Sequence, residues 1–248
     1  MYRRAVSRSL TSAFASPEAK RRHVRRLFAT IADRYDLITR VLSYGMDGRW
    51  KRRLIARAVV RPGERALDLA TGTGDVAFGL AERGAVVAGL DVTHRMLQLA
   101  RAKQGAAAGS AGVVWTTGDM AALPFPADVF AVVTTSYGLR NVPDLSEAIA
   151  EIVRVLAPGG RFLSLDFNRP ESPFLRAAYL GYLTVVGSTL GWVLHGDPDT
   201  YRYIPESIRR YPGAHGVTEL LRGAGLTGVA AMPLLGGLMT IHVARRPG

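Results

Sequence analysis

A glycine-rich turn is the first place in the chain where residue types and spacing could do chemistry. Gly72 and Gly74 follow an apolar run that contains Asp68, and a helical pattern begins at Val76. Glycines let a backbone pass close to a ligand, and the N–H groups at a helix start are partly positive. The segment predicts a strand, a ligand-binding turn and a helix. A plain tight turn without a ligand is the alternative.

An acidic residue after the next predicted strand indicates which kind of ligand the turn binds. Residues 86–90 form a second apolar run, and Asp91 follows it directly. A carboxylate roughly twenty residues beyond such a turn can accept hydrogen bonds from both hydroxyls of a ribose. The two features together predict the first half of a nucleotide-binding α/β fold.

Polar residues also follow the third and fourth predicted strands. The strand predicted at 113–117 precedes Asp119 and Met120, where a carboxylate could meet an adenine amino group and a thioether could pack on its ring. The strand predicted at 129–136 ends on Ser136. In open α/β sheets, ligands bind beyond the carboxyl ends of the strands. We therefore expect these side chains to gather at one edge of the sheet.

Strand, loop and helix recur from residue 65 to a fifth predicted strand at 161–165. This repetition predicts an α/β fold with a doubly wound, mostly parallel sheet. Apolar runs at 226–232 and 238–244 predict two further strands, the last of them antiparallel, so that the sheet has seven. Residues 18–58 show helical spacing, so two or three helices precede the first strand.

The length of the chain bounds its domain organisation. With 248 residues, 48% of them hydrophobic, it can bury one large core. We expect a basic segment over residues 1–20 and one domain over 21–248, with an insertion at 172–212 after the fifth strand. Inside the insertion, residues 177–194 are 18 residues without a charge, which is long enough to span a membrane. Their position within a sheet domain favours an apolar lid, and a buried pair of helices is the alternative.

Positive charge is concentrated in the first quarter of the chain. The net charge is +12, and residues 1–61 hold 16 Lys and Arg against 4 Asp and Glu, whereas the remainder holds 16 of each. A basic N-terminal quarter followed by a neutral remainder predicts docking to an anionic membrane surface. The alternative is that these basic residues are simply exposed to solvent. Residues 1–17 fit an amphipathic interfacial helix, a transit peptide or a frayed tail. No aromatic stacking platform accompanies the arginines, so we expect no nucleic acid partner.

The chain contains no cysteine, and its five histidines show no metal-ligand spacing. Disulfides and thiolate metal sites are therefore excluded, and a reducing compartment is favoured. We expect no metal cofactor.

Several short motifs resemble one family, the C-methyltransferases of menaquinone and ubiquinone biosynthesis. The matches extend from about residue 25 to the carboxyl end of the chain. They are RYDL at 34–37, LSYG at 42–45, WKR at 50–52, LDLATGTGD at 67–75, ALPFP at 122–126, GLRNV at 138–142, RVLAPGG at 154–160, YRY at 201–203 and ESI at 206–208.

The resemblance implies the Rossmann-like fold of class I methyltransferases, with S-adenosylmethionine as methyl donor. The resemblance places Thr73, Asp91, Asp119, Met120 and Ser136 at cofactor contact positions, and we also predict that Asp68, Gly72 and Gly74 of the glycine-rich segment bind the cofactor. The implied acceptor is a polyprenyl quinol, demethylmenaquinol or the methoxybenzoquinol of ubiquinone synthesis; another apolar acceptor, such as a polyketide, sterol or phospholipid, is the alternative. We also expect a bacterial cytoplasmic protein at the inner face of the membrane, with organelle targeting less favoured and a homodimer compatible with the sequence.

Methylation of a ring carbon requires a quinol hydroxyl to lose its proton, and the pKa of a phenol is near ~10. Arg140 and Asn141, just beyond the fourth predicted strand, could stabilise the quinolate or orient a water that takes the proton. We predict these two as catalytic residues, and hydrogen bonds that only structure the loop are the alternative. Arg140 together with Tyr137, Tyr201 and Tyr203 is predicted to bind the acceptor.

Overall fold

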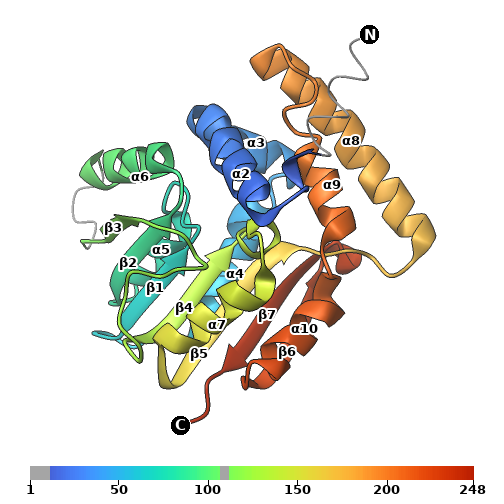
Figure 1. Ribbon diagram of the computed structural model, residues 1–248. Coiled ribbons are helices and arrows are strands. Elements are labelled where there is room, and N and C mark those ends of the chain that lie inside the picture. The colour runs from blue at the N-terminus through green and yellow to red at the C-terminus, as the bar shows by residue number, and fades with distance from the viewer. Residues whose placement is uncertain (1–11, 107–111) are drawn as a thin grey trace.

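One seven-stranded sheet organises the computed structural model, which describes residues 12–106 and 112–248 (Figure 1). The strands are β1 Arg65–Leu69, β2 Val86–Asp91, β3 Val114–Thr117, β4 Phe130–Ser136, β5 Leu156–Phe167, β6 Thr227–Leu234 and β7 Met239–Arg245. The α-helices are α2 Pro17–Ile31, α3 Tyr35–Leu42, α4 Asp47–Ala58, α5 Asp75–Ala81, α6 His94–Ala106, α7 Leu145–Val155, α8 Pro173–His195, α9 Tyr203–Arg210 and α10 Gly213–Gly223.

The strand order is β3-β2-β1-β4-β5-β7-β6, which confirms the predicted doubly wound sheet. Strands β1 to β5 pair parallel, and β7 pairs antiparallel with both β5 and β6. The direction of winding reverses between β1 and β4, and a crevice at such a reversal is the usual ligand site of open α/β sheets. The fifth strand is longer than predicted, because Leu156 already pairs with Phe130 before an irregularity in the register.

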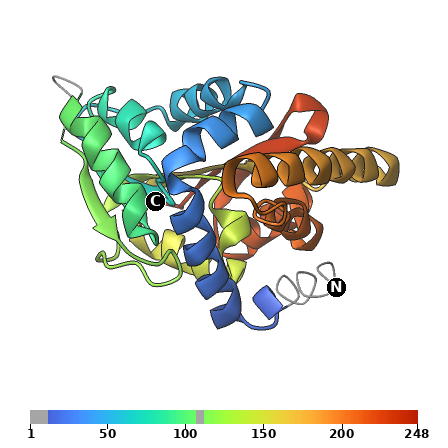
Figure 2. The same cartoon turned by 90° about the horizontal axis from the view of Figure 1, so that it is seen from above.

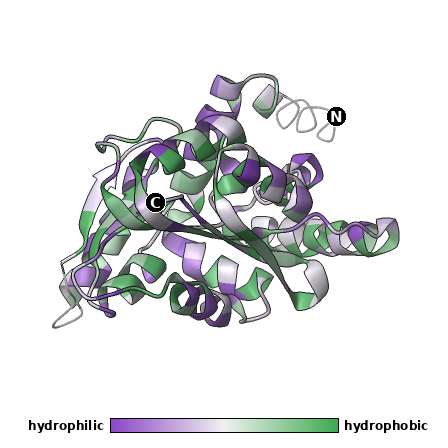
Figure 3. Cartoon of the chain, turned by 90° about the horizontal axis from the view of Figure 1, so that it is seen from below, coloured by the Kyte–Doolittle hydropathy of each residue, from purple (hydrophilic) through white to green (hydrophobic). Residues whose placement is uncertain are grey.

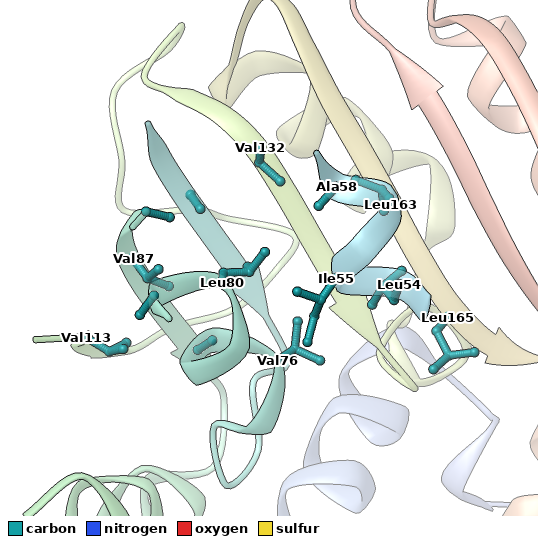
Figure 4. Packing of buried hydrophobic residues seen from close by; sticks show 14 of the residues in the cluster. Leu54, Ile55, Ala58, Val76, Leu80, Val87, Val113, Val132, Leu163 and Leu165 are labelled. Carbon is teal, nitrogen blue, oxygen red and sulfur yellow. The ribbon is translucent and has the colours of Figure 1, made fainter. Parts of the chain in front are cut away.

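Helices cover both faces of the sheet and bury its apolar runs. On one face, Leu54 and Ile55 of α4 and Val76 of α5 pack with Val132 of β4 and Leu163 of β5 (Figure 4). On the other face, α7 and α10 enclose a second buried cluster with β1, β4 and β5. Central strands that are buried on both faces need apolar residues at successive positions, which explains why these runs do not alternate with polar residues.

The helices before β1 and the insertion after β5 form a third cluster beside the sheet. It is built around Ile38 of α3, Leu180 and Leu183 of α8, and Tyr201. Helix α2 is capped at its start by the Ser16 hydroxyl, which accepts a hydrogen bond from the N–H of Ala19. These elements confirm the predicted helices before the first strand and the helical insertion after strand five.

The apolar segment of the insertion forms one helix, α8, so the alternative of a buried helix pair is wrong. By length and composition α8 could cross a membrane. Of its most apolar window, 28% is buried in the protein, so most of it is not covered by other parts of the chain. In Figure 2, seen from above, α8 extends well beyond the rest of the chain. Residues 1–17, for which the sequence allows an amphipathic helix, a transit peptide or a frayed tail, fall mostly outside the described residues.

Candidate active site

Two adjoining cavities lie at the carboxyl ends of the strands. The first, which we call the loop cavity, is lined by the ends of β1, β2 and β4. The second, the tyrosine cavity, lies against α3, α8 and α9. Phe28, Tyr35 and Tyr137 line both cavities, so the two meet at these three aromatic rings.

The glycine-rich turn has the backbone conformation that the sequence predicts. Gly72 and Gly74 both have positive φ, +55° and +90°. A Cβ added at Gly74 would lie 2.7 Å from the ring of Trp115, so this position has no room for another residue. Gly72 lines the loop cavity, whereas Gly74 begins α5.

Asp68 lies under the turn and does not line the loop cavity. Its carboxylate accepts hydrogen bonds from the hydroxyls of Thr71, at 2.6 Å, and Thr134, at 2.7 Å. Burial raises the pKa of Asp68 to about 6, although the two hydroxyls oppose that rise. Because both contacts are to the protein's own side chains, Asp68 connects the turn, through Thr71, to strand β4, through Thr134.

Asp91 faces the loop cavity from the end of β2. Its two carboxylate oxygens accept hydrogen bonds from the N–H groups of Gly72, at 2.9 Å, and Thr93, at 2.8 Å. Burial raises the pKa of this carboxyl, and the two N–H groups act in the opposite direction. Each carboxylate oxygen can accept a second hydrogen bond, so Asp91 keeps acceptor capacity for a ligand in the cavity.

Asp119, Met120 and Ser136 line the loop cavity as well. Asp119 is already paired: its carboxylate lies 2.6 Å from Nε of Arg21 on α2 and accepts a hydrogen bond from the N–H of Ala121. Helix α2 therefore covers this end of the cavity. The Arg21 contact is absent from the sequence prediction, because nothing local in the chain connects residues so far apart.

Thr73 does not line the loop cavity and instead lines a smaller recess beside it. Its hydroxyl donates to Asp36 at 2.8 Å and accepts from Nζ of Lys103 at 2.9 Å. The recess shares Tyr35 and Gly72 with the loop cavity. Thr73 thus reaches a neighbouring part of the same site.

Lys51 and Asp47 of α4, which the sequence analysis does not identify, connect the recess to Tyr137. Nζ of Lys51 lies 2.8 Å from Asp47 and 3.0 Å from Asp75 at the start of α5. The Tyr137 hydroxyl donates to Asp47 at 2.6 Å. Burial would lower the pKa of Lys51, but Asp47 and Asp75 raise it above its ordinary value, so the ammonium stays charged.

Arg140 is buried at the wall of the tyrosine cavity. Its backbone N–H donates to Asp166 at 3.1 Å. In the guanidinium, Nε lies 3.4 Å from the same carboxylate and Nη1 donates to the hydroxyl of Ser207. The guanidinium also lies 5.0 Å from the centre of the Phe167 ring. The cation is therefore held in place from three sides.

Asn141 follows Arg140 but faces the loop cavity. Its Nδ2 donates to the carbonyl oxygen of Tyr137 at 2.8 Å, and its buried Oδ1 has no hydrogen-bond partner among the described residues. Buried polar atoms without a partner are rare, and at a cavity wall they often receive a ligand or a water.

Tyr201 and Tyr203 line the tyrosine cavity together with Tyr137 and Arg140, so the four residues predicted to bind an acceptor lie together. The Tyr201 hydroxyl lies 2.8 Å from Nε2 of His195. Burial raises the pKa of Tyr201 to about 12 and raises that of Tyr203 further. Both hydroxyls are therefore uncharged at neutral pH, and the two rings line the cavity as neutral side chains. Across residues 12–106 and 112–248, no group of three His, Asp or Glu side chains is arranged to hold a metal ion.

Comparison with known proteins identifies the family. The model of the ubiE/COQ5 methyltransferase family matches residues 16–246. The demethylmenaquinone methyltransferase of Thermus thermophilus is 42% identical over 223 residues, which are 89% of this chain and 100% of that one. The ubiquinone/menaquinone biosynthesis C-methyltransferase UbiE of Francisella philomiragia is 34% identical over 230 residues, 91% of this chain and 92% of that one.

Solved structures show the same fold at low sequence identity. A SAM-dependent methyltransferase of Thermotoga maritima superposes with a TM-score of 0.65 at 18% identity, covering 90% of this chain and 99% of that one. Phosphoethanolamine N-methyltransferase 2 of Haemonchus contortus, in complex with S-adenosyl-L-methionine, gives 0.61 at 14% identity and covers 81% and 53%. The fold is that of SAM-dependent methyltransferases. With a family match along nearly its whole length, the chain belongs to the ubiE/COQ5 methyltransferase family.

Proposed function

We propose that the protein transfers the methyl group of S-adenosylmethionine to a ring carbon of a reduced polyprenyl quinol, with demethylmenaquinol as the foremost acceptor. The observation that carries this proposal is the pair of cavities that meet at Phe28, Tyr35 and Tyr137. One cavity has a carboxylate at a strand end, as a nucleoside requires. The other is aromatic and contains a buried guanidinium, which suits an apolar ring that becomes an anion.

The residues of the loop cavity fit the methyl donor. Asp91 would accept hydrogen bonds from the ribose hydroxyls, since Gly72 and Thr93 already hold its carboxylate toward the cavity. Asp119 and Met120 would lie at the adenine, with Asp119 shared between the base and Arg21. When bound, the cofactor supplies an electrophilic methyl group.

On the acceptor side, the buried guanidinium of Arg140 would favour loss of the quinol proton, because a positive charge in a water-poor site stabilises the developing quinolate. Asn141 lines the loop cavity, where its Oδ1, which lacks a partner among the described residues, would accept a hydrogen bond from a water that receives the quinol proton. Asp166 offsets part of the Arg140 charge, so the guanidinium is stabilised when no quinolate is present. Tyr201 and Tyr203 would pack against the ring.

We further propose that the protein acts as a peripheral protein at the cytoplasmic surface of a bacterial membrane. A homodimer is compatible with this proposal. The supporting feature is the excess of arginine before β1. On α2, Arg22, Arg25 and Arg26 are exposed and line an open hollow together with Arg95. Such a surface attracts anionic headgroups.

Transfer of label from S-adenosylmethionine to defined quinols tests the function. Reduced demethylmenaquinone should gain one methyl group, read by mass, whereas the same compound in its oxidised form should gain none because it offers no hydroxyl to deprotonate. Binding of the cofactor without methylation of reduced quinols of either ring type would refute the proposal. Labelling of another apolar lipid would then identify the acceptor.

A further inference from the structure

The outward side of α8 is apolar over most of its length, with Ser188 and Thr189 as its polar residues between Val185 and Trp192. Phe174, Val185 and Trp192 are 84%, 67% and 66% exposed, and their spacing places them on one face of the helix. Figure 3 colours α8, at the right, green and white over most of its length. Helices at the surface of soluble proteins normally turn charged residues outward. The only Asp, Glu, Lys or Arg residue in α8 is Arg176.

Helix α3 extends this surface. Leu37 and Val41 are exposed on one face of α3, and Tyr44 is exposed in the turn that follows the helix. The ring of Tyr44 stacks on that of Tyr182 in α8, with centroids 5.1 Å apart. We call the combined surface of Leu37, Val41, Tyr44, Phe174, Val185, Trp192 and Val193 the α3–α8 apolar face. Apolar patches of this kind are uncommon on soluble monomers and mark interaction surfaces.

The opposite side of α8 is fixed to the protein. Leu180 and Leu183 lie in the buried third cluster. At Gly191, an added Cβ would lie 2.4 Å from the carbonyl oxygen of Asp197, so the helix touches the following backbone closely. A helix held in this way along one side would have to detach from its domain to span a bilayer. It can lie in the plane of a membrane surface without moving.

We propose that the α3–α8 apolar face inserts into the headgroup region of an anionic lipid bilayer. The face is continuous with the acceptor site, since Tyr44, in the turn after α3, and Tyr179 of α8 line the tyrosine cavity. This inference rests on the proposed function, because an acceptor with a prenyl chain resides in the bilayer and has to reach that cavity.

The charges around the face also match anionic lipid. No acidic residue occurs between Ser172 and Gly196, whereas Arg40 of α3 and Arg176 of α8 flank the apolar residues. Arg34 donates to the carbonyl oxygen of Leu194 near the end of α8. An apolar face with an exposed tryptophan and flanking arginines is typical of helices that lie in a membrane interface.

The chain has its own reporter for this contact. Of its three tryptophans, Trp50 and Trp115 are 3% and 9% exposed, so the emission of Trp192 alone should respond strongly to lipid. Adding vesicles of phosphatidylcholine and phosphatidylglycerol should shift the emission to the blue, and brominated lipids should quench it. Trp192→Phe should lose both responses while still pelleting with vesicles.

Two charge insertions test the face directly. Val185→Glu and Phe174→Glu should each lower the vesicle partition constant about tenfold, because an apolar side chain that inserts into the lipid is replaced by a charge. Val86→Glu is the matched control, since Val86 is exposed at the opposite end of the sheet, where β2 begins. All three should unfold at the parent temperature.

Activity separates this inference from the proposed function. In vesicle-free solution, the two glutamate variants should methylate a tail-less quinol at the parental rate, and a failure of parent and variants alike would concern the function instead. Unchanged partition of Val185→Glu and Phe174→Glu, or a Trp192 emission that ignores vesicles, would overturn the inference. So would variants that turn a parental dimer into monomers without any vesicle binding, because the face would then belong to a second copy.

Discussion

Replacing Arg140 by alanine should affect folding and catalysis separately, and the structure allows the two effects to be distinguished. Arg140 and Asp166 are both buried, and their closest charged atoms lie 3.4 Å apart. Removing one partner of a buried pair commonly costs about 3–5 kcal/mol, since the remaining charge is left without compensation. Arg140→Ala should therefore lower the free energy of unfolding by that amount, measured in urea.

A second substitution, Asp166→Asn, removes the carboxylate that Arg140→Ala leaves without a partner. In Arg140→Ala, Asp166→Asn should recover a large part of the lost stability, because the buried carboxylate no longer has to be desolvated. It should not recover turnover, which we expect to fall by about 10²–10³ in both variants if the guanidinium stabilises the quinolate. Calorimetric titration should find little change in affinity for S-adenosylmethionine. Arg222→Ala, which breaks an exposed pair with Glu219, is the control.

The pH dependence gives an independent check. Burial already raises the pKa of Asp166, and the Arg140 guanidinium opposes this rise. Without Arg140, the folded protein binds the Asp166 proton still more tightly than the unfolded chain does. Its stability should then fall as pH increases from the ordinary carboxyl range through the raised pKa. The stability gap between single and double variant should be wider at neutral than at acidic pH, and full turnover by Arg140→Ala would refute the assigned role.

Three further outcomes follow from the site. Asp91→Ala should weaken S-adenosylmethionine binding by about 1.5–3 kcal/mol in calorimetry, since a charged acceptor is lost, and unchanged affinity in a folded variant would remove Asp91 from the site. Tyr137→Phe should lower the free energy of unfolding in urea by a similar amount, because Asp47 loses a hydrogen bond; equal stability would show that the bond contributes nothing. Reversing Arg25 and Arg26 to Glu should reduce pelleting with anionic vesicles, less so at high salt, and equal pelleting would contradict membrane docking by α2.

The parts of the site that depend on local chain geometry could be predicted from the sequence. The positive φ angles of Gly72 and Gly74 are accessible chiefly to glycine, so the turn is recognisable wherever such residues separate a strand from a helix. The positions of Asp91 and Ser136 at strand ends follow from the lengths of the apolar runs. Parallel strands then bring these residues to one edge of the sheet.

Contacts between distant segments could not be predicted in this way. Lys51 reads as part of a basic helix surface, yet two carboxylates from different helices hold it in a buried position. Asp68 resembles a cofactor residue because it stands next to the turn, whereas its carboxylate points to Thr134 of the neighbouring strand. In each case the partner is brought near only by the fold.

Helix α8 shows a different limit. Leu183 is buried and Val185 is exposed, although both are apolar residues of one uncharged segment. Where the inward and outward sides of a helix are both apolar, the sequence has no periodicity that shows which side is buried. The expectation that the segment covers an apolar acceptor therefore applies to its inner side, where Tyr179 lines the tyrosine cavity.

Helix α2, which covers the loop cavity, is also the first described helix to be synthesised. Lys20 donates a hydrogen bond to the carbonyl oxygen of Val142, a residue 122 positions later in the chain, and Arg21 pairs with Asp119. The Arg21 contact cannot form until β3 and Asp119 have left the ribosome, and the Lys20 contact also requires β4 and the turn after it. Contacts across such long loops form late because closing the loop costs entropy. Docking of α2 over the strand ends around Asp91 is therefore expected to be a late step of folding. A bulky fusion placed before α2 should slow that docking and leave the rate of sheet formation unchanged.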